Sequence, residues 1–319
     1  MSGRHLFCFG LGYTARALGR RLAAHGWTVT GTCRGGARGA AQPQAGFPAM
    51  RFARDRPLPT AALDPVSHIL VSIPPDENGD PALDLHLADI ARLPRLSWLG
   101  YLSTTGVYGD RGGGWVDEGD PPAPSGERGR RRVVAETRWL DTWRGRGVPV
   151  HIFRLAAIYG PGRSPFAALR AGTATRIDRP GQVFSRIHVE DLATALAASI
   201  EKPRPGAVYN VCDDEPAASA AVVAYAAELL GLPPPPMVPL AAAGLSPTGL
   251  SFYDDNKRVG NALIKRELGI AWRYPDYRAG LAAIRDADAA GLPKKAGSGM
   301  VARNAIDTPG APLGTGGKA

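Results

Sequence analysis

A glycine turn between an apolar run and an amphipathic run opens this sequence, and it limits the folds that the chain can adopt. Residues 6–9 are apolar and rich in aromatic side chains, and residues 13–25 repeat apolar positions at helical spacing. A second β-prone run follows at residues 27–33. Together the three runs predict a strand–turn–helix–strand unit, the first crossover of a parallel sheet.

The turn itself reads Gly10-x-Gly12-x-x-Ala15, a pattern typical of dinucleotide binding when it joins a strand to a helix. Gly10 permits a tight turn, Gly12 lets the backbone approach a pyrophosphate, and Ala15 is small enough to pack the helix on the strand. The first-turn N–H groups, including those of Tyr13 and Thr14, face the phosphates with the positive end of the helix dipole. We therefore predict that these five residues form the cofactor site.

The end of the second strand indicates which dinucleotide binds. Sites that prefer NAD carry an acidic residue about 20 positions beyond the turn, where it holds the ribose hydroxyls. Residues 32–36 read Thr-Cys-Arg-Gly-Gly instead, and Arg38 follows. Because a guanidinium can form two charge-assisted hydrogen bonds to a 2′-phosphate, we predict NADP(H) as the cofactor and Arg34 as its principal contact. The alternative is a solvated surface arginine.

Composition limits the class of protein and its partners. The chain has 319 residues, of which 44% are hydrophobic, enough to bury the core of one large or two coupled domains. The net charge of +9 comes from 32 arginines and only six lysines, beside 40 glycines and 29 prolines. This excess of arginine, glycine and proline is more typical of genome-wide base composition than of a basic surface selected for binding. No motif of a nucleic-acid-binding module accompanies it. We expect no nucleic-acid partner.

Apolar stretches and cysteines indicate the compartment. No apolar stretch is long enough to span a membrane, and the first residues lack the apolar region of a signal peptide. The three cysteines, Cys8, Cys33 and Cys212, are scattered along the chain. We expect reduced thiols in a cytoplasmic protein without a membrane partner, a disulfide frame or a metal site.

Strand-like and helix-like runs alternate along most of the chain, which predicts an α/β fold with a Rossmann-type doubly wound parallel sheet. The further strands are expected at residues 50–53, 68–72, 98–103, 148–155 and 208–211, and the helices at 84–93, 132–144, 190–200, 219–230 and 276–288.

The spacing of these runs suggests two regions and a tail. The loop at residues 106–126 is long and rich in Gly, Pro and acids, and such loops lie where parallel sheets bind ligands. The expected division is a dinucleotide-binding domain at 1–160, completed by about 187–213, a small C-terminal substrate-binding region at 161–186 and 214–290, and a disordered tail at 291–319.

Five motifs fall in the order and spacing of one known superfamily. They are GLGYTA at 10–15, YLSTTGVYGD at 101–110, RLAAIYGPGR at 154–163, RIHVEDLA at 186–193 and VYNVCDDEP at 208–216. The chain resembles the extended short-chain dehydrogenase/reductases, which include nucleotide-sugar epimerases and dehydratases. The resemblance implies a Rossmann domain with a small C-terminal substrate domain and an active site between them. It also implies a Ser/Thr that fixes the substrate oxygen and a Tyr-x-x-x-Lys pair that transfers a proton.

The hydroxyl of that family pattern is present here, but the Tyr-Lys pair is replaced. Counting back from the V-Y-G motif places the hydroxyl at Thr104. With Glu136 as the matching helix glutamate, the Lys position falls on Arg132 and the Tyr position on Arg128. Arginine stays protonated and has no acceptor, so Arg128 is not an ordinary acid–base group. Arg132 could hold the nicotinamide ribose, and residues 128–132 could bind an anionic substrate group or form a solvated basic helix start.

Two more departures bear on the substrate. Family dehydratases carry Asp-Glu after the active-site Thr, but Thr105 and Gly106 stand here, which disfavours dehydration. Family epimerases hold the substrate diphosphate with an arginine at the position of Phe184, and this chain has Arg186 two residues later. Period-two alternation keeps Arg186 on the same strand face, so we retain it as a substrate contact.

Three further residues are predicted to lie near the cleft. Tyr108 of the V-Y-G motif is a candidate substrate contact, with packing as the alternative. Ser72 and Pro74 follow the strand at 68–72 and are expected to form a rigid wall beneath the cofactor.

These observations predict an atypical member of the superfamily, an NADP(H)-dependent oxidoreductase or epimerase-like enzyme. It would act on a small polar carbonyl or alcohol, with Thr104 orienting the substrate oxygen and the proton donor unassigned. The alternative is a non-catalytic NADP(H)-binding sensor or scaffold. Related folds pair through the helices expected here at 84–93 and 132–144, so a homodimer is possible.

Overall fold

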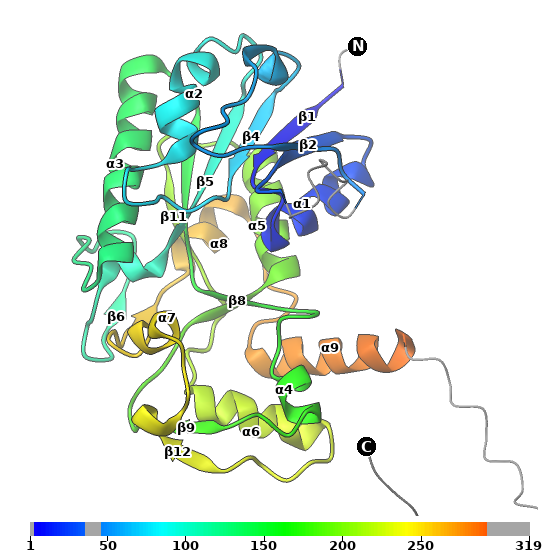
Figure 1. Cartoon of the computed structure of the whole chain (residues 1–319), viewed down its shortest axis with the longest axis vertical. Coiled ribbons are helices and arrows are strands. Elements are labelled where there is room, and N and C mark those ends of the chain that lie inside the picture. Colours follow the sequence, from blue (N-terminus) through cyan, green and yellow to red (C-terminus); the bar gives the residue numbers. More distant parts are fainter. Residues whose placement is uncertain (1–2, 36–45, 292–319) are drawn as a thin grey trace, which may run out of the picture.

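A computed structural model describes residues 3–35 and 46–291 of the chain, and Figure 1 shows a parallel sheet with helices on both sides above a smaller lower region. The sheet has seven strands in the order β11-β7-β5-β4-β1-β2-β3, all parallel. The predicted Rossmann-type α/β fold is confirmed. The strands are β1 (His5–Phe9), β2 (Thr28–Cys33), β3 (Ala49–Arg51), β4 (His68–Val71), β5 (Trp98–Thr104), β7 (Val150–Leu155) and β11 (Val208–Val211).

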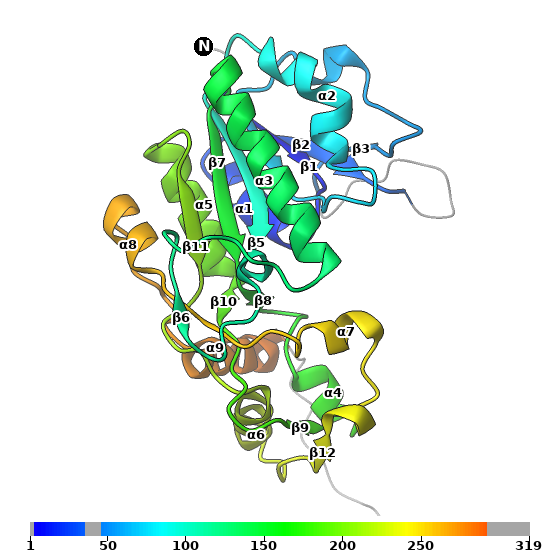
Figure 2. The same ribbon diagram turned by 90° about the vertical axis from the view of Figure 1, so that its left-hand side faces the viewer.

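Both faces of the sheet are buried, which explains why its strands are apolar runs without clean alternation. One face packs on α2 (Pro81–Ala91) and α3 (Glu127–Arg146), with Trp139 fully buried between them and the sheet. The opposite face packs on α1 (Tyr13–Ala23), α5 (Val189–Glu201) and α8 (Ala262–Leu268). Figures 1 and 2 show these two layers of helices.

Strand order reverses between β1 and β4, which lie side by side at the centre of the sheet. In open parallel sheets, ligands bind in the crevice outside the carboxyl ends of the strands at such a reversal. The turn at Gly10 and the turn at Ser72 leave the sheet at this point, so the topology places the glycine motif at the expected ligand site.

The lower region lies beyond the carboxyl ends of the strands (Figure 1). Its helix α9 is longer than predicted and includes Gly291, the first residue of the expected tail; the rest of that tail, residues 292–319, lies outside the described residues. The region contains β8 (Ala157–Tyr159) paired with β10 (Arg186–His188), β9 (Arg176–Asp178) paired with β12 (Met237–Pro239), and the helices α4 (Phe166–Arg170), α6 (Ser219–Leu229), α7 (Pro247–Ser251) and α9 (Tyr277–Gly291).

The long loop at 106–126 carries more structure than the sequence predicts. It starts within a 3-10 turn (Thr105–Tyr108) and contains β6 (Trp115–Val116), which pairs in parallel with β13 (Arg258–Val259). Helix α3 begins at Glu127, five residues before the predicted start. The carboxylate of Glu127 favours this earlier start because it lies at the positive end of the helix dipole and pairs with two arginines of the next turn.

A buried ion pair connects α3 to the sheet beneath the predicted active site. Arg154 on β7 donates to Glu136 on α3 from two nitrogen atoms, and the shortest N–O distance is 2.8 Å. Ser103 at the end of β5 donates to the same carboxylate. Arg154 also donates to the hydroxyl of Tyr108, which donates in turn to Asn210 on β11. This network fixes α3, β5, β7 and β11 against one another.

The structure shows the state of the cysteines and the length of the helices. All three cysteines are free; Cys8 and Cys212 are buried and Cys33 is half-buried. Among the described residues, no helix is long and apolar enough to cross a membrane.

Replacing Glu136 by Ala is expected to destabilise the protein by about 3–5 kcal/mol, because Arg154 would keep its charge in a buried site without a partner. Urea denaturation of the purified variant would measure this loss. Thr137→Ala is the matched control, since Thr137 is exposed one residue further along the helix. A loss for Glu136→Ala as small as that of the control would contradict a structural role for the pair.

Candidate functional site

The turn after β1 depends on Gly10, as the motif predicts. Its φ is +93°, a backbone conformation that favours glycine, and a Cβ at this position would lie 2.8 Å from the Ile73 side chain. Its N–H donates to the Thr32 hydroxyl at 2.8 Å, and its carbonyl accepts from the Ser72 hydroxyl at 2.6 Å. Ser72 therefore connects the two turns at the reversal of strand order.

The N-terminus of α1 is open and uncapped. Gly12 is the N-cap residue, no side chain caps the helix, and its first turn contains no acidic residue. A Cβ at Gly12 would meet no atom within 4 Å, so there is free space above the first turn. Ala15 is fully buried against the sheet, as predicted. Uncapped N–H groups that face free space are suited to hold a phosphate, and the site therefore fits a dinucleotide.

The neighbours of this turn differ in exposure. Thr14 is buried, and Tyr13 is half-buried with its hydroxyl donating to the Pro161 carbonyl at 3.0 Å. Pro74 is exposed beside Ser72. The backbone N–H groups of Tyr13 and Thr14 can therefore face a phosphate, while their side chains fix the turn to its surroundings.

Two arginines lie at the tip of β2, one predicted and one missed. Arg34 is exposed, and Arg51 on β3 lies so close to Gly35 that no Cβ would fit there. Cys33 and Arg51 are partners in the parallel register, which brings Arg51 to the tip. Among the described residues, neither guanidinium has a carboxylate partner. Arg38, which the sequence placed nearby, is outside the described residues. Only the pairing of β2 with β3 brings Arg51 to this tip, and no local motif in the sequence indicates that pairing.

Thr104 stands at the carboxyl end of β5. It is half-buried, and its hydroxyl oxygen accepts from the Gly106 N–H at 3.1 Å. A hydroxyl has one proton to donate in addition to its acceptor capacity. Thr104 can therefore donate to an oxygen atom in the crevice while it caps the following 3-10 turn.

The arginine run at the start of α3 separates into three environments. Arg130 and Arg131 both pair with Glu127, at 2.9 and 3.1 Å. These two residues form a solvated basic helix start, which was the alternative to anion binding. Arg132 turns back to donate to the Leu102 carbonyl, and its guanidinium carbon lies 5.6 Å from the centre of the Tyr101 ring. Arg128 is exposed and lies over the Phe252 ring at 5.2 Å.

Two predicted substrate contacts are corrected by the structure. Tyr108 is fully buried, and its hydroxyl is bonded to Arg154 and Asn210, so the packing alternative is right. Arg186 is 9% exposed and donates to the carbonyls of Phe184 and Ala217 at 2.7 and 2.8 Å. Both side chains support the site from within the core, because neighbouring elements cover them.

Glu118 of the long loop has a role that the sequence did not indicate. Its carboxylate accepts from the Asn210 N–H at 2.7 Å, and burial raises its pKa. This bond fixes the loop to β11. Among the described residues, no group of three or more His, Cys, Asp or Glu side chains could hold a metal ion.

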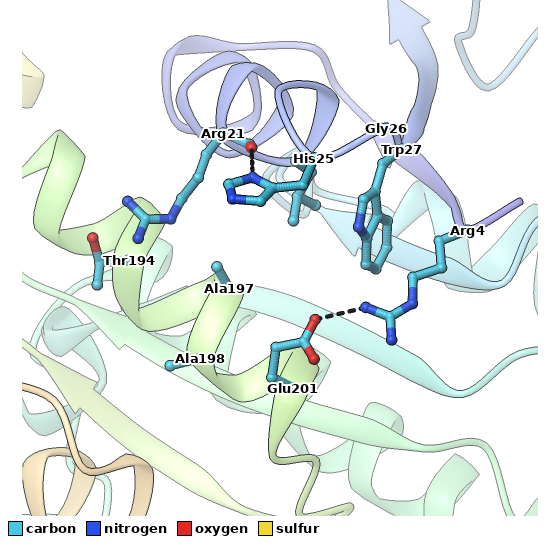
Figure 3. A pocket seen from close by; sticks show the side chains of 10 residues that line it. Arg4, Arg21, His25, Gly26, Trp27, Thr194, Ala197, Ala198 and Glu201 are labelled. Atoms are coloured by element: carbon cyan, nitrogen blue, oxygen red, sulfur yellow. Dashed lines mark hydrogen bonds and ion pairs between the residues drawn. The ribbon is translucent and has the colours of Figure 1, made fainter.

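A groove of about 560 Å³ opens between α1 and α5, and its lining includes Arg4, His25, Trp27 and Glu201 (Figure 3). Arg4 pairs with Glu201 at 2.8 Å. Since Arg4 precedes β1 and His25 follows α1, the groove lies at the amino edge of the sheet, opposite the glycine turn. The candidate site lies instead at the carboxyl edge of the sheet, where the strand order reverses and where the glycine turn and Thr104 are found.

Comparison with known proteins identifies a family model and a relative that match this chain. The sequence model of the NAD dependent epimerase/dehydratase family matches residues 78–212. The chain is 30% identical over 281 residues to protein YeeZ of Escherichia coli K12, covering 84% of this chain and 95% of YeeZ.

Two solved structures resemble this chain. A functionally unknown conserved protein from Silicibacter pomeroyi DSS is 51% identical, with a TM-score of 0.81 over 89% of this chain and 99% of that one. The dTDP-glucose 4,6-dehydratase of Bacillus anthracis, solved with NAD, is 18% identical with a TM-score of 0.73, over 91% of this chain and 97% of its own. The latter likeness concerns the fold alone.

Asp213 is expected to make stability fall with rising pH. Its side chain is 2% exposed, and burial raises its pKa from 3.8 to about 8. Between these values the folded protein keeps a proton that the unfolded chain releases, so the free energy of unfolding falls by about 1.4 kcal/mol per pH unit.

Denaturation of the wild type and Asp213→Asn at pH 5, 6, 7 and 8 would measure this dependence. The amide variant should lack this contribution to the slope, so its stability relative to the wild type should rise with pH. Asp141→Asn, on the exposed surface of α3, is the control. A difference between the wild type and Asp213→Asn that stays constant with pH would contradict the assignment.

Proposed function

Because this chain belongs to the NAD-dependent epimerase/dehydratase family, we propose that it is an NADP(H)-dependent oxidoreductase or epimerase-like enzyme acting on a small polar carbonyl or alcohol. The observation that carries the proposal is the open, uncapped N-terminus of α1 at the reversal of strand order, with Gly12 facing free space. Thr104 lies at the same edge of the sheet, two strands from β1.

Charge at the tip of β2 supports the choice of NADP(H). A ribose 2′-phosphate would meet the guanidinium groups of Arg34 and Arg51 there, and no carboxylate among the described residues pairs with either one. Gly12 and the first-turn N–H groups of α1 would hold the pyrophosphate. An acidic residue at the tip would repel the 2′-phosphate, and none stands at residues 32–35.

In the proposed reaction, the cofactor and the protein side chains would have different roles. When bound, the nicotinamide supplies or accepts a hydride. Thr104 donates a hydrogen bond to the substrate oxygen and fixes its position. Arg132, held against β5 by the Leu102 carbonyl, keeps further N–H groups for the ribose hydroxyls.

A non-catalytic sensor or scaffold is the second candidate. It is favoured by the two arginines, Arg128 and Arg132, that occupy the positions of the family's proton-transferring Tyr and its Lys. Under this alternative the protein binds NADP(H) without turnover and transmits the bound state to a partner.

The proposed preference for NADP(H) predicts how the two cofactors bind. Fluorescence titration should give tighter binding of NADPH than of NADH, and Arg34→Ala should lower this preference about tenfold or more, because a hydrogen bond to a charged group contributes about 1.5–3 kcal/mol. Arg51→Ala should lower it in the same direction.

Arg144→Ala is the control for these titrations, since Arg144 lies near the far end of α3 and pairs with Asp141. All measurements need one fixed salt concentration, because these contacts are between charges. An unchanged NADPH/NADH ratio in Arg34→Ala would refute the NADP(H) assignment, and binding of neither cofactor would refute the proposed enzyme.

A further prediction separates the enzyme from the sensor or scaffold. If the protein is an enzyme, Thr104→Val should lower the rate of NADPH oxidation with carbonyl substrates by about 10²-fold, the usual effect of removing one oxygen-binding donor. Thr104→Ser should restore most of the rate, and Thr105→Val is the neighbouring control. Cofactor binding without turnover in the wild type would favour the sensor.

A further inference from the structure

Arg128 at the start of α3 and Phe252 after α7 form a contact between the Rossmann domain and the lower region. Figures 1 and 2 both show α7 beneath the N-terminal end of α3. The guanidinium carbon of Arg128 lies 5.2 Å from the centre of the Phe252 ring. We propose that this pair binds the substrate, and that the substrate is a carboxylate attached to a flat aromatic or conjugated group. The inference rests on the proposed function, whose active site it extends.

The position of Arg128 relative to Thr104 is fixed by close packing. The next residue of the helix, Gly129, is buried, and a Cβ there would lie 2.8 Å from the Gly106 carbonyl oxygen. Gly106 in turn donates its N–H to Thr104. The first turn of α3 is therefore pressed against the segment that presents the reactive hydroxyl, and Arg128 lies at the edge of the same crevice.

Charge around Arg128 favours an anion. Among the described residues no carboxylate lies within ion-pair distance of it, whereas Glu127 already pairs with Arg130 and Arg131. On the lower side of the crevice, the Lys257 ammonium is neutralised by Asp255 at 2.9 Å and donates to the Gly109 carbonyl. Arg128 therefore keeps its positive charge without a carboxylate partner among the described residues, and a guanidinium binds a carboxylate through two parallel hydrogen bonds.

Phe252 supplies the flat surface. Its side chain is 53% exposed, so part of the ring surface is open to contact with a ligand. The following residue, Tyr253, is buried and packs edge-on against Phe184 at 5.1 Å, which holds the Phe252 backbone in place. A planar group joined to the carboxylate would stack on the exposed ring, and the carboxylate would then meet the guanidinium.

Calorimetric titration of the full-length protein with trans-cinnamate, with and without NADPH, tests the proposal. The neutral amide of the same shape, trans-cinnamamide, tests the charge, and hexanoate tests the planar group. We expect cinnamate to bind about tenfold tighter than either comparison compound. Arg128→Gln should abolish the preference for cinnamate over the amide, and Phe252→Leu should abolish the preference over hexanoate.

Arg130→Gln is the matched control, because Arg130 lies on the same turn and is engaged by Glu127. Thermal unfolding and NADPH binding of each variant should match the wild type, since Arg128 and Phe252 are exposed. Equal affinity for cinnamate and its amide, absence of cinnamate binding, or an unchanged preference in Arg128→Gln would overturn the proposal. If NADPH still binds in that case, the proposed enzyme stands and only this substrate class fails.

Discussion

The arrangement of the candidate site depends on the buried ion pair between Glu136 and Arg154. Two charges removed from water remain stable only when nearly all of their hydrogen-bonding capacity is satisfied, and Ser103 and Tyr108 supply the additional bonds. These residues come from α3, β5, β7 and the turn after β5, so the pair sets the distance between helix and sheet. Thr104 follows Ser103 directly, and its position in the crevice is a consequence of this network.

The replacement of the family's Tyr and Lys by arginines changes what the start of α3 can do. An arginine in the Tyr position exchanges a group that can transfer a proton for a permanent cation. The surrounding structure then decides how each positive charge is used. Glu127 pairs with two of them, the backbone of β5 holds Arg132, and Arg128 has no carboxylate partner among the described residues.

Much of the fold was predictable because its signals are local. The glycine turn, the apolar strands and the helix between them follow from residues near one another in the sequence, and β11 has the predicted bounds. Candidate side chains were less predictable. Tyr108 and Arg186 occupy motif positions near the crevice, yet burial directs both into the core. Whether a polar side chain on a motif faces a ligand or the interior depends on the elements that cover it, and these are distant in the sequence.

The sequence by itself determined the turn after β1, because the positive φ of Gly10 is a backbone conformation that favours glycine. It also determined the absence of a carboxylate at the tip of β2. Only the tertiary structure decided which arginines remain available. Arg51 reaches that tip through the pairing of β2 with β3, and Arg128 meets Phe252 across 124 residues of chain. The sequence specifies which side chains are charged. Whether an arginine is paired depends on which carboxylates the folded chain brings within a few ångströms of its guanidinium.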